Sequence, residues 1–282
     1  MNRKKKNSIP EYINSPLNNP MINYSVYKMK KAERLLVVLI SFIIGGLVGQ
    51  IFYGGLFKID DIATTKTYIS NIVVFIIVGI CAVKFLVPLY KKNRLEKRRS
   101  ALNNQFRDML ESIASSFAAG GNVMNAFDIA LADLRMQYNE TDYIVAELKE
   151  IVDGIRQNIR PEEMLAAFAQ RTGNEDIESF ADIFNICYQK GGNMSDVVQR
   201  THSVMTQKMA VADEIKTKLT SNKMQHNIMS LMPIALVFFL KLSNDSFAES
   251  FATATGVIAN TVAIGIFVGS YLYGQKIVNI KV

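Results

Sequence analysis

Gly120-Gly121-Asn122 and Gly191-Gly192-Asn193 are two copies of one tripeptide within a polar block, Ser100 to Asn227, that lies between strongly apolar segments. Each copy ends one run of apolar residues at helical spacing and begins another. A glycine pair adopts the positive φ that ends a helix, and Asn caps the helix that follows. Ordinary helix punctuation explains either copy alone. Two copies with matched flanks predict a helical hairpin used twice, with structural glycines Gly120, Gly121, Gly191 and Gly192.

The flanks that match are apolar residues three and four positions apart. They are Phe106, Met109, Leu110, Ile113 and Phe117 before the first copy, and Ile177, Phe180, Ala181, Phe184 and Tyr188 before the second. Two more stripes run from Val123 to Leu134 and from Ile144 to Ile155, and helix starts are indicated at Pro161 and Asn174. We therefore expect a compact antiparallel helical bundle. Because a β-branched residue is strained at positive φ, Gly121→Val and Gly192→Val are expected to destabilise its turns.

The charge of the chain is divided unevenly along its length. Residues 1–99 carry 17 Lys and Arg against 5 Asp and Glu, whereas residues 100–227 carry 12 against 18. The net charge of +7 therefore conceals an acidic central block. Because an acidic block is a poor surface for a nucleic acid, we expect no nucleic-acid partner.

Apolar segments on both sides of the polar block indicate a membrane protein. Leu35 to Phe57 and Phe251 to Tyr273 are each 23 residues without a charge, and Ile69 to Tyr90 is interrupted only by Lys84. Each of these segments is long enough to span a bilayer as a helix. Ile228 to Leu240 offers only 13 apolar residues, so it is the weakest of the four expected spans.

Lysine and arginine flank the first pair of spans on both sides, which predicts that both termini and the polar block are cytoplasmic. The expected domains are a basic cytoplasmic tail that is disordered (1–34), a transmembrane hairpin (35–90), a cytoplasmic helical domain (91–227), a second transmembrane hairpin (228–273) and a short cytoplasmic tail (274–282). The fold class is therefore an all-α membrane protein, in which two N-terminal and two C-terminal transmembrane helices flank a cytoplasmic antiparallel helical bundle.

Patterns typical of catalytic, cofactor or metal sites do not occur in the sequence. It has no Gly-x-x-x-x-Gly-Lys phosphate loop, no Gly-x-Ser-x-Gly and no His-Glu-x-x-His. Cys81 and Cys187 lack metal or redox spacing, and His202 and His226 have no ligand residues arranged around them. We expect a protein that is not an enzyme, with no cofactor and no metal.

The order of these features resembles a known family. Two spans and a basic stop precede Phe106-Arg107-Asp108-Met109-Leu110, Ala119-Gly120-Gly121 and Gly191-Gly192-Asn193, and two more spans follow. Over roughly residues 90–240 this pattern resembles the type II secretion F-domain family, and most of all its single-F-domain members TadB and TadC of tight-adherence (Flp) pilus systems, without separating the two. The resemblance implies a multi-pass platform protein of the bacterial inner membrane, whose helical F domain faces a hexameric secretion ATPase and whose membrane helices lie near the pilin's hydrophobic segment.

Two main hypotheses for the function follow. In the first, the protein couples motion of the secretion ATPase to insertion or extraction of pilin subunits, beside a paralogous F-domain platform protein and as a homo- or hetero-oligomer. In the second, it is a membrane-tethered signalling or scaffold protein whose spans are only anchors. A small transporter is disfavoured, because only Lys84 and Asn260 bring polar groups into the spans, and Lys84 is placed to snorkel.

Acidic side chains of the polar block are the candidate contacts to the ATPase. They are Glu111, Asp128, Glu162, Glu163 and Asp182. Like charge on a small bundle opposes folding slightly, and binding to a basic partner surface would explain why these acids are present. Solubility is the alternative explanation.

Overall fold

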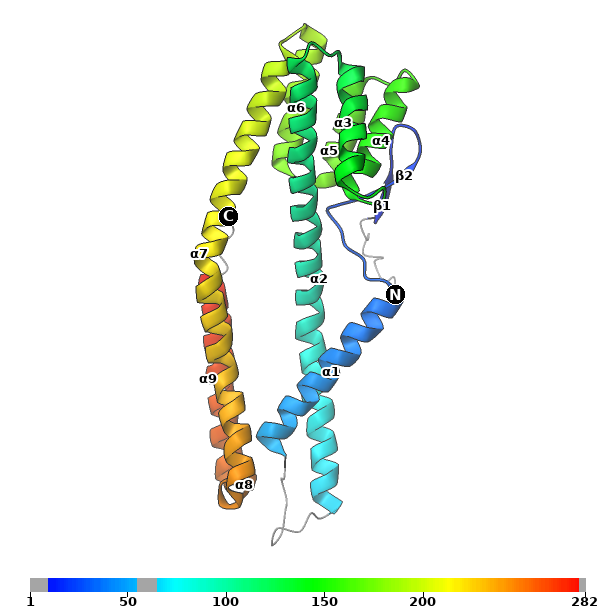
Figure 1. The fold of residues 1–282 in the computed structure, drawn as a ribbon. Helices are drawn as coiled ribbons and strands as arrows, with labels where there is room; N and C mark the ends of the chain where they lie inside the picture. The colour runs from blue at the N-terminus through cyan, green and yellow to red at the C-terminus, as the bar shows by residue number, and fades with distance from the viewer. Residues whose placement is uncertain (1–9, 55–64, 279–282) are drawn as a thin grey trace, which may run out of the picture. The chain divides into compact units, whose positions relative to one another are not determined.

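The structure, a computed structural model, describes residues 10–54 and 65–278. Nearly all described residues outside the connections are helical (Figure 1). They divide into two compact units: a helical domain, residues 10–28 with 91–210, and a membrane unit, residues 29–54 with 65–90 and 211–278. The expected all-α membrane fold is confirmed.

The regular elements begin and end as follows. They are β1 (Tyr12–Asn14), β2 (Pro20–Ile22), α1 (Lys31–Tyr53), α2 (Thr65–Ala118), α3 (Val123–Gln137), α4 (Tyr143–Arg156), α5 (Pro161–Thr172), α6 (Glu175–Lys190), α7 (Met194–Ser243), α8 (Asp245–Ala252) and α9 (Ala254–Val278). The helix starts expected at Pro161 and Asn174 are confirmed, because Pro161 is the first residue of α5 and Asn174 caps α6.

Four of the described helices, α1, α2, α7 and α9, are long and apolar enough to cross a membrane. The weakest expected span, Ile228 to Leu240, is the last part of the long helix α7. Two of the helices cross the boundary between the units without interruption, because α2 and α7 each begin in one unit and end in the other. Which side of the membrane each terminus occupies stays a prediction.

Glycines allow α1 and α2 to pack closely within the membrane unit. A Cβ added at Gly45 would lie 2.3 Å from the Cβ of Ala82, and one added at Gly46 would lie 2.4 Å from the ring of Phe75. Both separations are far below van der Waals contact, so the two helices approach at a distance that only glycine permits. A Cβ at Gly265 or Gly269 on α9 meets nothing within 4 Å.

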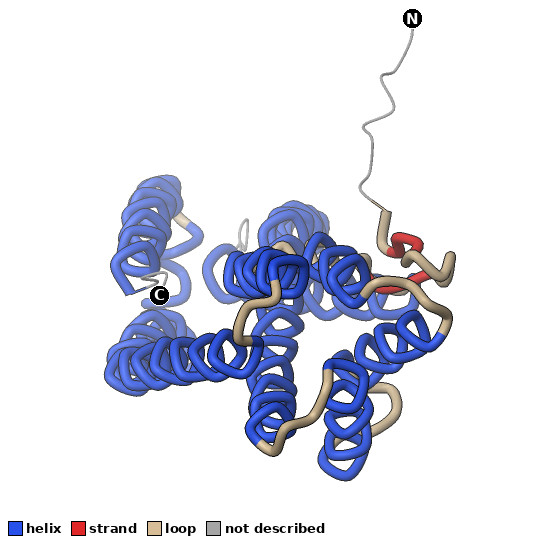
Figure 2. The backbone as a smooth tube through the Cα atoms, turned by 90° about the horizontal axis from the view of Figure 1, so that it is seen from above, coloured by secondary structure: helices blue, strands red, loops and turns tan. Residues whose placement is uncertain are grey.

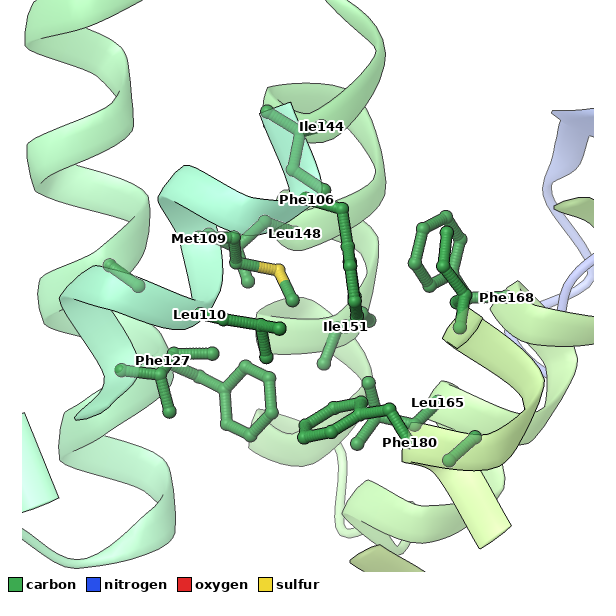
Figure 3. Packing of buried hydrophobic residues seen from close by; sticks show 14 of the residues in the cluster. Phe106, Met109, Leu110, Phe127, Ile144, Leu148, Ile151, Leu165, Phe168 and Phe180 are labelled. Atoms are coloured by element: carbon green, nitrogen blue, oxygen red, sulfur yellow. The ribbon is translucent and has the colours of Figure 1, made fainter. Parts of the chain in front are cut away.

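The core of the helical domain is built from the apolar stripes read from the sequence. Phe106 on α2 packs against Phe168 on α5 and Phe180 on α6, with ring centroids 6.0 and 5.6 Å apart (Figure 3). Leu148 and Ile151 of α4 are also buried in this core. Phe127 of α3 is buried there too. Because side chains from α2, α3, α4, α5 and α6 meet in it, the core fixes these five helices as one bundle.

The N-terminal hairpin, residues 10–28, corrects the expectation of a disordered tail. Strands β1 and β2 pair antiparallel, with Tyr12 opposite Ile22 and Ile13 opposite Met21. Figure 2 shows the two strands in red beside the blue helices of the domain. Tyr24 follows β2 and is only 1% exposed. Composition alone suggested disorder, whereas tertiary contacts order residues 10–28; residues 1–9 lie outside the described part of the chain.

Candidate functional site

The turn between α2 and α3 is the first Gly-Gly-Asn copy. Gly120 has φ +85°, in the left-handed region. Its N–H donates to the carbonyl of Phe117 over 3.0 Å, and the N–H of Gly121 donates to the carbonyl of Ser116 over 2.9 Å. This pair of bonds is the Schellman motif, which satisfies the last carbonyls of a helix.

The turn between α6 and α7 repeats this geometry in the second copy. Gly191 has φ +72° and the N–H of Gly192 donates to the carbonyl of Cys187 over 2.8 Å. Capping of the following helix is also repeated. The Oδ1 of Asn122 accepts from the N–H of Asn125 at 2.8 Å, and that of Asn193 accepts from the N–H of Asp196 at 3.3 Å. The two turns therefore share a first glycine at positive φ, a bond from the second glycine to the carbonyl five residues earlier and an Asn cap. They differ in the bond of the first glycine, because the N–H of Gly191 donates to the carbonyl of Cys187, four residues earlier.

The second glycine of each pair is needed for a reason other than the expected one. Among described glycines, positive φ occurs at Gly120, Gly173 and Gly191, so Gly121 and Gly192 are not in the left-handed region. A Cβ at Gly121 would instead lie 2.7 Å from the Oγ of Ser116, and one at Gly192 would lie 3.1 Å from the Sγ of Cys187. Valine there would be opposed by crowding against the preceding helix and not by strained φ.

The five candidate acids do not share one environment. Glu111 on α2, Glu163 on α5 and Asp182 on α6 are exposed. Asp128 is half-buried, and its Oδ1 accepts a hydrogen bond from Arg156 Nη2 at 2.8 Å. Asp128 therefore already has a charge partner on α4, and Glu111 lies 4.0 Å from Nε2 of His202 on α7.

Glu162 departs from the expectation, because its side chain is buried in the domain at 5% exposure. Its Oε2 has no hydrogen-bond partner within the described residues, and Arg160 lies 3.5 Å from its Oε1. The residue lies three and seven positions before Leu165 and Ala169, which are also buried. That helical spacing was the signal that places Glu162 on the core face of α5.

An exposed acidic stripe on α6 includes one of the candidates. Glu175, Glu178 and Asp182 are all exposed and lie three, four and seven positions apart, on one face of the helix. Asp176, between them in sequence, forms an ion pair with Lys208 of α7. We call Glu175, Glu178 and Asp182 the α6 acidic stripe.

A buried ion pair that the sequence analysis did not identify joins α4 to α5. Arg171 donates from Nη1 and Nη2 to the two oxygens of Glu147 at 2.7 and 2.6 Å. The side chains are 3% and 1% exposed. Burial raises the pKa of Glu147, and the hydrogen bonds and charge of Arg171 oppose that rise. Glu147 lies three positions after Ile144 and four before Ile151, so helical spacing again indicated its core face.

The N-terminal hairpin covers this ion pair. The hydroxyl of Tyr24 donates to Glu147 Oε1 at 2.9 Å, and the Tyr24 N–H donates to the carbonyl of Arg171 at 2.8 Å. Burial, together with the nearby carboxylate of Glu147, raises the pKa of Tyr24 well above its ordinary value. A second acid of α4, Glu150, accepts from the hydroxyl of Ser15 at 2.5 Å and from the amide of Asn19 at 3.0 Å.

Arg107 and Asp108, which belong to the Phe106 to Leu110 motif, hold a neighbouring helix end in place. Asp108 accepts from Arg107 Nη2 at 2.8 Å, and its other oxygen accepts a short hydrogen bond from the hydroxyl of Tyr138. Burial, and then the bond to Asp108, raises the pKa of Tyr138 to about 12. The motif therefore fastens the residue after α3 to α2.

Within residues 10–54 and 65–278, no group of three His, Cys, Asp or Glu side chains is arranged to hold a metal ion. The fold and the surfaces define the class first: an all-α membrane protein that combines a helical bundle, closed by two matched glycine turns, with apolar helices.

The family follows from comparison with known proteins. The family model described as type II secretion system (T2SS), protein F, matches residues 99–240, and the chain belongs to this family. The resemblance to the F-domain family is confirmed, and that family is one of membrane platform proteins related to type II secretion and type IV pili. Searches among curated proteins and among solved structures found no match.

Proposed function

We propose that this protein is the inner-membrane platform of a tight-adherence (Flp) pilus or type II secretion system, which couples a cytoplasmic secretion ATPase to insertion or extraction of pilin subunits. The observation that carries the proposal is membership of the protein F family over residues 99–240. The exposed acids on the helical domain favour a basic partner, which we take to be the ATPase. Pilin subunits and a paralogous F-domain protein are the partners proposed for the membrane unit.

The α6 acidic stripe is the surface we propose for the ATPase. Its three carboxylates are exposed and project from one helix face, whereas Glu162 is buried and Asp128 is paired to Arg156. Glu111 and Glu163 remain candidates at the edge of such a contact. Because exposed charges are screened by salt, an interface built on them weakens as ionic strength rises.

The test is binding of the full-length chain in detergent to the cognate secretion ATPase, at low and high salt. The double variant Glu178→Lys, Asp182→Lys should weaken binding at low salt by about tenfold or more and flatten the salt dependence. A matched control is Asp213→Lys, Glu214→Lys on α7, which makes the same change in charge at two exposed positions. The control should bind like the parent.

Three outcomes separate the hypotheses. Equal weakening by both double variants would mean that net charge, and not the α6 acidic stripe, governs binding. Unchanged binding by both would remove the stripe from the interface. Failure of the parent to bind the ATPase at all would favour the second hypothesis, a membrane-tethered signalling or scaffold protein.

The proposed localisation is the inner membrane, with four spans and both termini in the cytoplasm. Reporter fusions after Arg135 and after Asp245 should report inside and outside, respectively. The companion fusion after Asp61 lies outside the described residues and should also report outside. An inside result at Asp245 alone would show that the last part of α7 does not span the membrane.

A further inference from the structure

The N-terminal hairpin is attached to the helical domain by one deep anchor and a rim of polar contacts. Tyr24 is its single side chain in the buried apolar core, whereas Leu17 and Ile22 are only partly buried against that core. The ring of Tyr24 meets that of Tyr143 on α4 edge to face, with centroids 5.6 Å apart. Hydrogen bonds from Ser15, Asn19 and Tyr24 to the acids of α4 add to this anchor. From α2, Arg99 Nε donates to the carbonyl of Tyr24 at 3.4 Å and Arg98 Nη1 donates to that of Val26 at 3.3 Å.

The surface beneath the hairpin remains satisfied if the hairpin leaves. Glu147 keeps both hydrogen bonds from Arg171, and the Nε of Arg171 keeps its bond to the carbonyl of Ala167 at 3.1 Å. Glu150 exchanges Ser15 and Asn19 for water. Departure therefore leaves no buried charge without a partner, which is the event that makes loss of a buried contact prohibitive.

The hairpin also lies at a particular place in the chain. Residues 26–30 have no regular structure, and α1 begins at Lys31. The first passage from the helical domain to the membrane unit is therefore not helical, whereas the passages within α2 and α7 are helical. Docking of the hairpin fixes the start of that first passage.

We propose that the N-terminal hairpin is a releasable strap. Docked through Tyr24 on α4 and α5, it ties the segment that leads into α1 to the helical domain. Released, it frees that segment and opens a surface of two acids, Glu147 and Glu150, and one arginine, Arg171. Release is a local event that leaves α2 to α6 folded, because Tyr24 is the one side chain of residues 10–28 in the buried core and the helices supply the rest.

Hydrogen exchange of the full-length chain in detergent measures this release directly. The amides of Asn23 and Tyr24 are bonded to Glu11 and Arg171, so they exchange only when these contacts open. Tyr24→Phe removes the bond to Glu147 and should speed exchange of residues 10–28 by about tenfold, with α3 and α6 unchanged. Tyr12→Phe is the matched control, because Tyr12 is in the same hairpin but is 55% exposed, and it should have no effect.

A disulfide supplies a second, reversible test. A Cβ at Gly173 would lie 3.6 Å from the Cβ of Ser25, within the range that a disulfide requires. Ser25→Cys and Gly173→Cys are introduced together into a chain with Cys81→Ala and Cys187→Ala. Oxidation of the new pair should slow exchange of residues 10–28 by tenfold or more, and reduction should restore the original exchange rate. Since Gly173 has φ +58°, Gly173→Cys alone is the control for backbone strain.

Two results would overturn the proposal. If residues 10–28 exchange only in step with α4 and α5, in parent and Tyr24→Phe alike, the hairpin opens with the whole domain and is no strap. If the oxidised and reduced forms of the cysteine pair exchange equally, opening does not involve separation of Ser25 from residue 173. Slower exchange on oxidation together with unchanged α3 and α6 would support it.

Discussion

Arg171→Met is the substitution from which we expect the largest loss of stability in the helical domain. Methionine keeps much of the arginine stem's volume but removes both hydrogen bonds that Arg171 donates to Glu147, which is 1% exposed. The carboxylate of Glu147 then keeps one hydrogen bond from this network, donated by the hydroxyl of Tyr24 at 2.9 Å. A buried charge stripped of its ion partner is the costliest outcome for such a pair.

The expected magnitude is about 3–5 kcal/mol, the range for breaking a buried ion pair by removing one partner. Single domains are stable by about 5–15 kcal/mol, so the loss is a large share of the total. Protonation of the Glu147 carboxylate limits this loss of stability. Its pKa, already raised by burial, rises further without Arg171. A carboxyl whose folded pKa is raised contributes stability below its unfolded pKa and loses it as pH rises through the folded value, so the variant should be least stable at neutral pH and above.

Native-state hydrogen exchange of α4 and α5 in the full-length chain is the assay. At tenfold per 1.4 kcal/mol, the best-protected amides should exchange some hundreds to thousands of times faster in Arg171→Met at neutral pH. The matched double variant, Arg171→Met with Glu147→Leu, removes both charges and should recover most of the loss. Equal destabilisation of the single and double variants, or a single-variant effect below tenfold, would refute the reasoning.

Three further predictions follow from local geometry. Gly191→Ala should lower the stability by about 1 kcal/mol, because Gly191 has positive φ. Gly191→Asn should lower it clearly less, since Asn tolerates the left-handed region. Equal losses of the two variants in thermal unfolding would exclude a backbone cause. Gly45→Leu should lower the thermal stability of the detergent-solubilised protein by about 1–3 kcal/mol through its clash with Ala82, whereas Gly269→Leu, in open space, should not. Between pH 10 and 12 the parent should lose stability as Tyr138 ionises, because its folded pKa of about 12 exceeds the ordinary 10.0; Tyr138→Phe should show a smaller loss in a pH titration followed by circular dichroism.

Local chemistry explains which parts of the fold were predictable. The two glycine turns were found from six residues, because helix ends are closed by bonds between near neighbours and need no tertiary information. The apolar stripes likewise indicated the core, and Phe106, Phe127, Phe168 and Phe180 are fully buried or nearly so. The sequence did not show which glycine of each pair has positive φ, because the turn geometry decides this.

The misjudged acids show where sequence reasoning stops. Glu162 was taken as a candidate contact because it is one of the acids of the polar block, and net charge does not depend on which face of a helix a residue occupies. Its spacing to Leu165 did indicate the core face. The contact of Tyr24 with Glu147 joins residues 123 positions apart, and no local pattern in the basic N-terminal sequence predicts it.

The 123 positions between Tyr24 and Glu147 have a consequence for synthesis of the protein. Tyr24 leaves the ribosome long before Glu147, and at about 5–20 residues per second the first must wait roughly 6–25 s for the second. During that interval the apolar stretches of α1 and α2 are synthesised, so the hairpin segment has to stay soluble without its docking surface. Its many asparagines and serines suit such a wait. The same order means that a fragment beginning at residue 91 would be produced without the N-terminal hairpin, so its Glu147 and Arg171 would be uncovered.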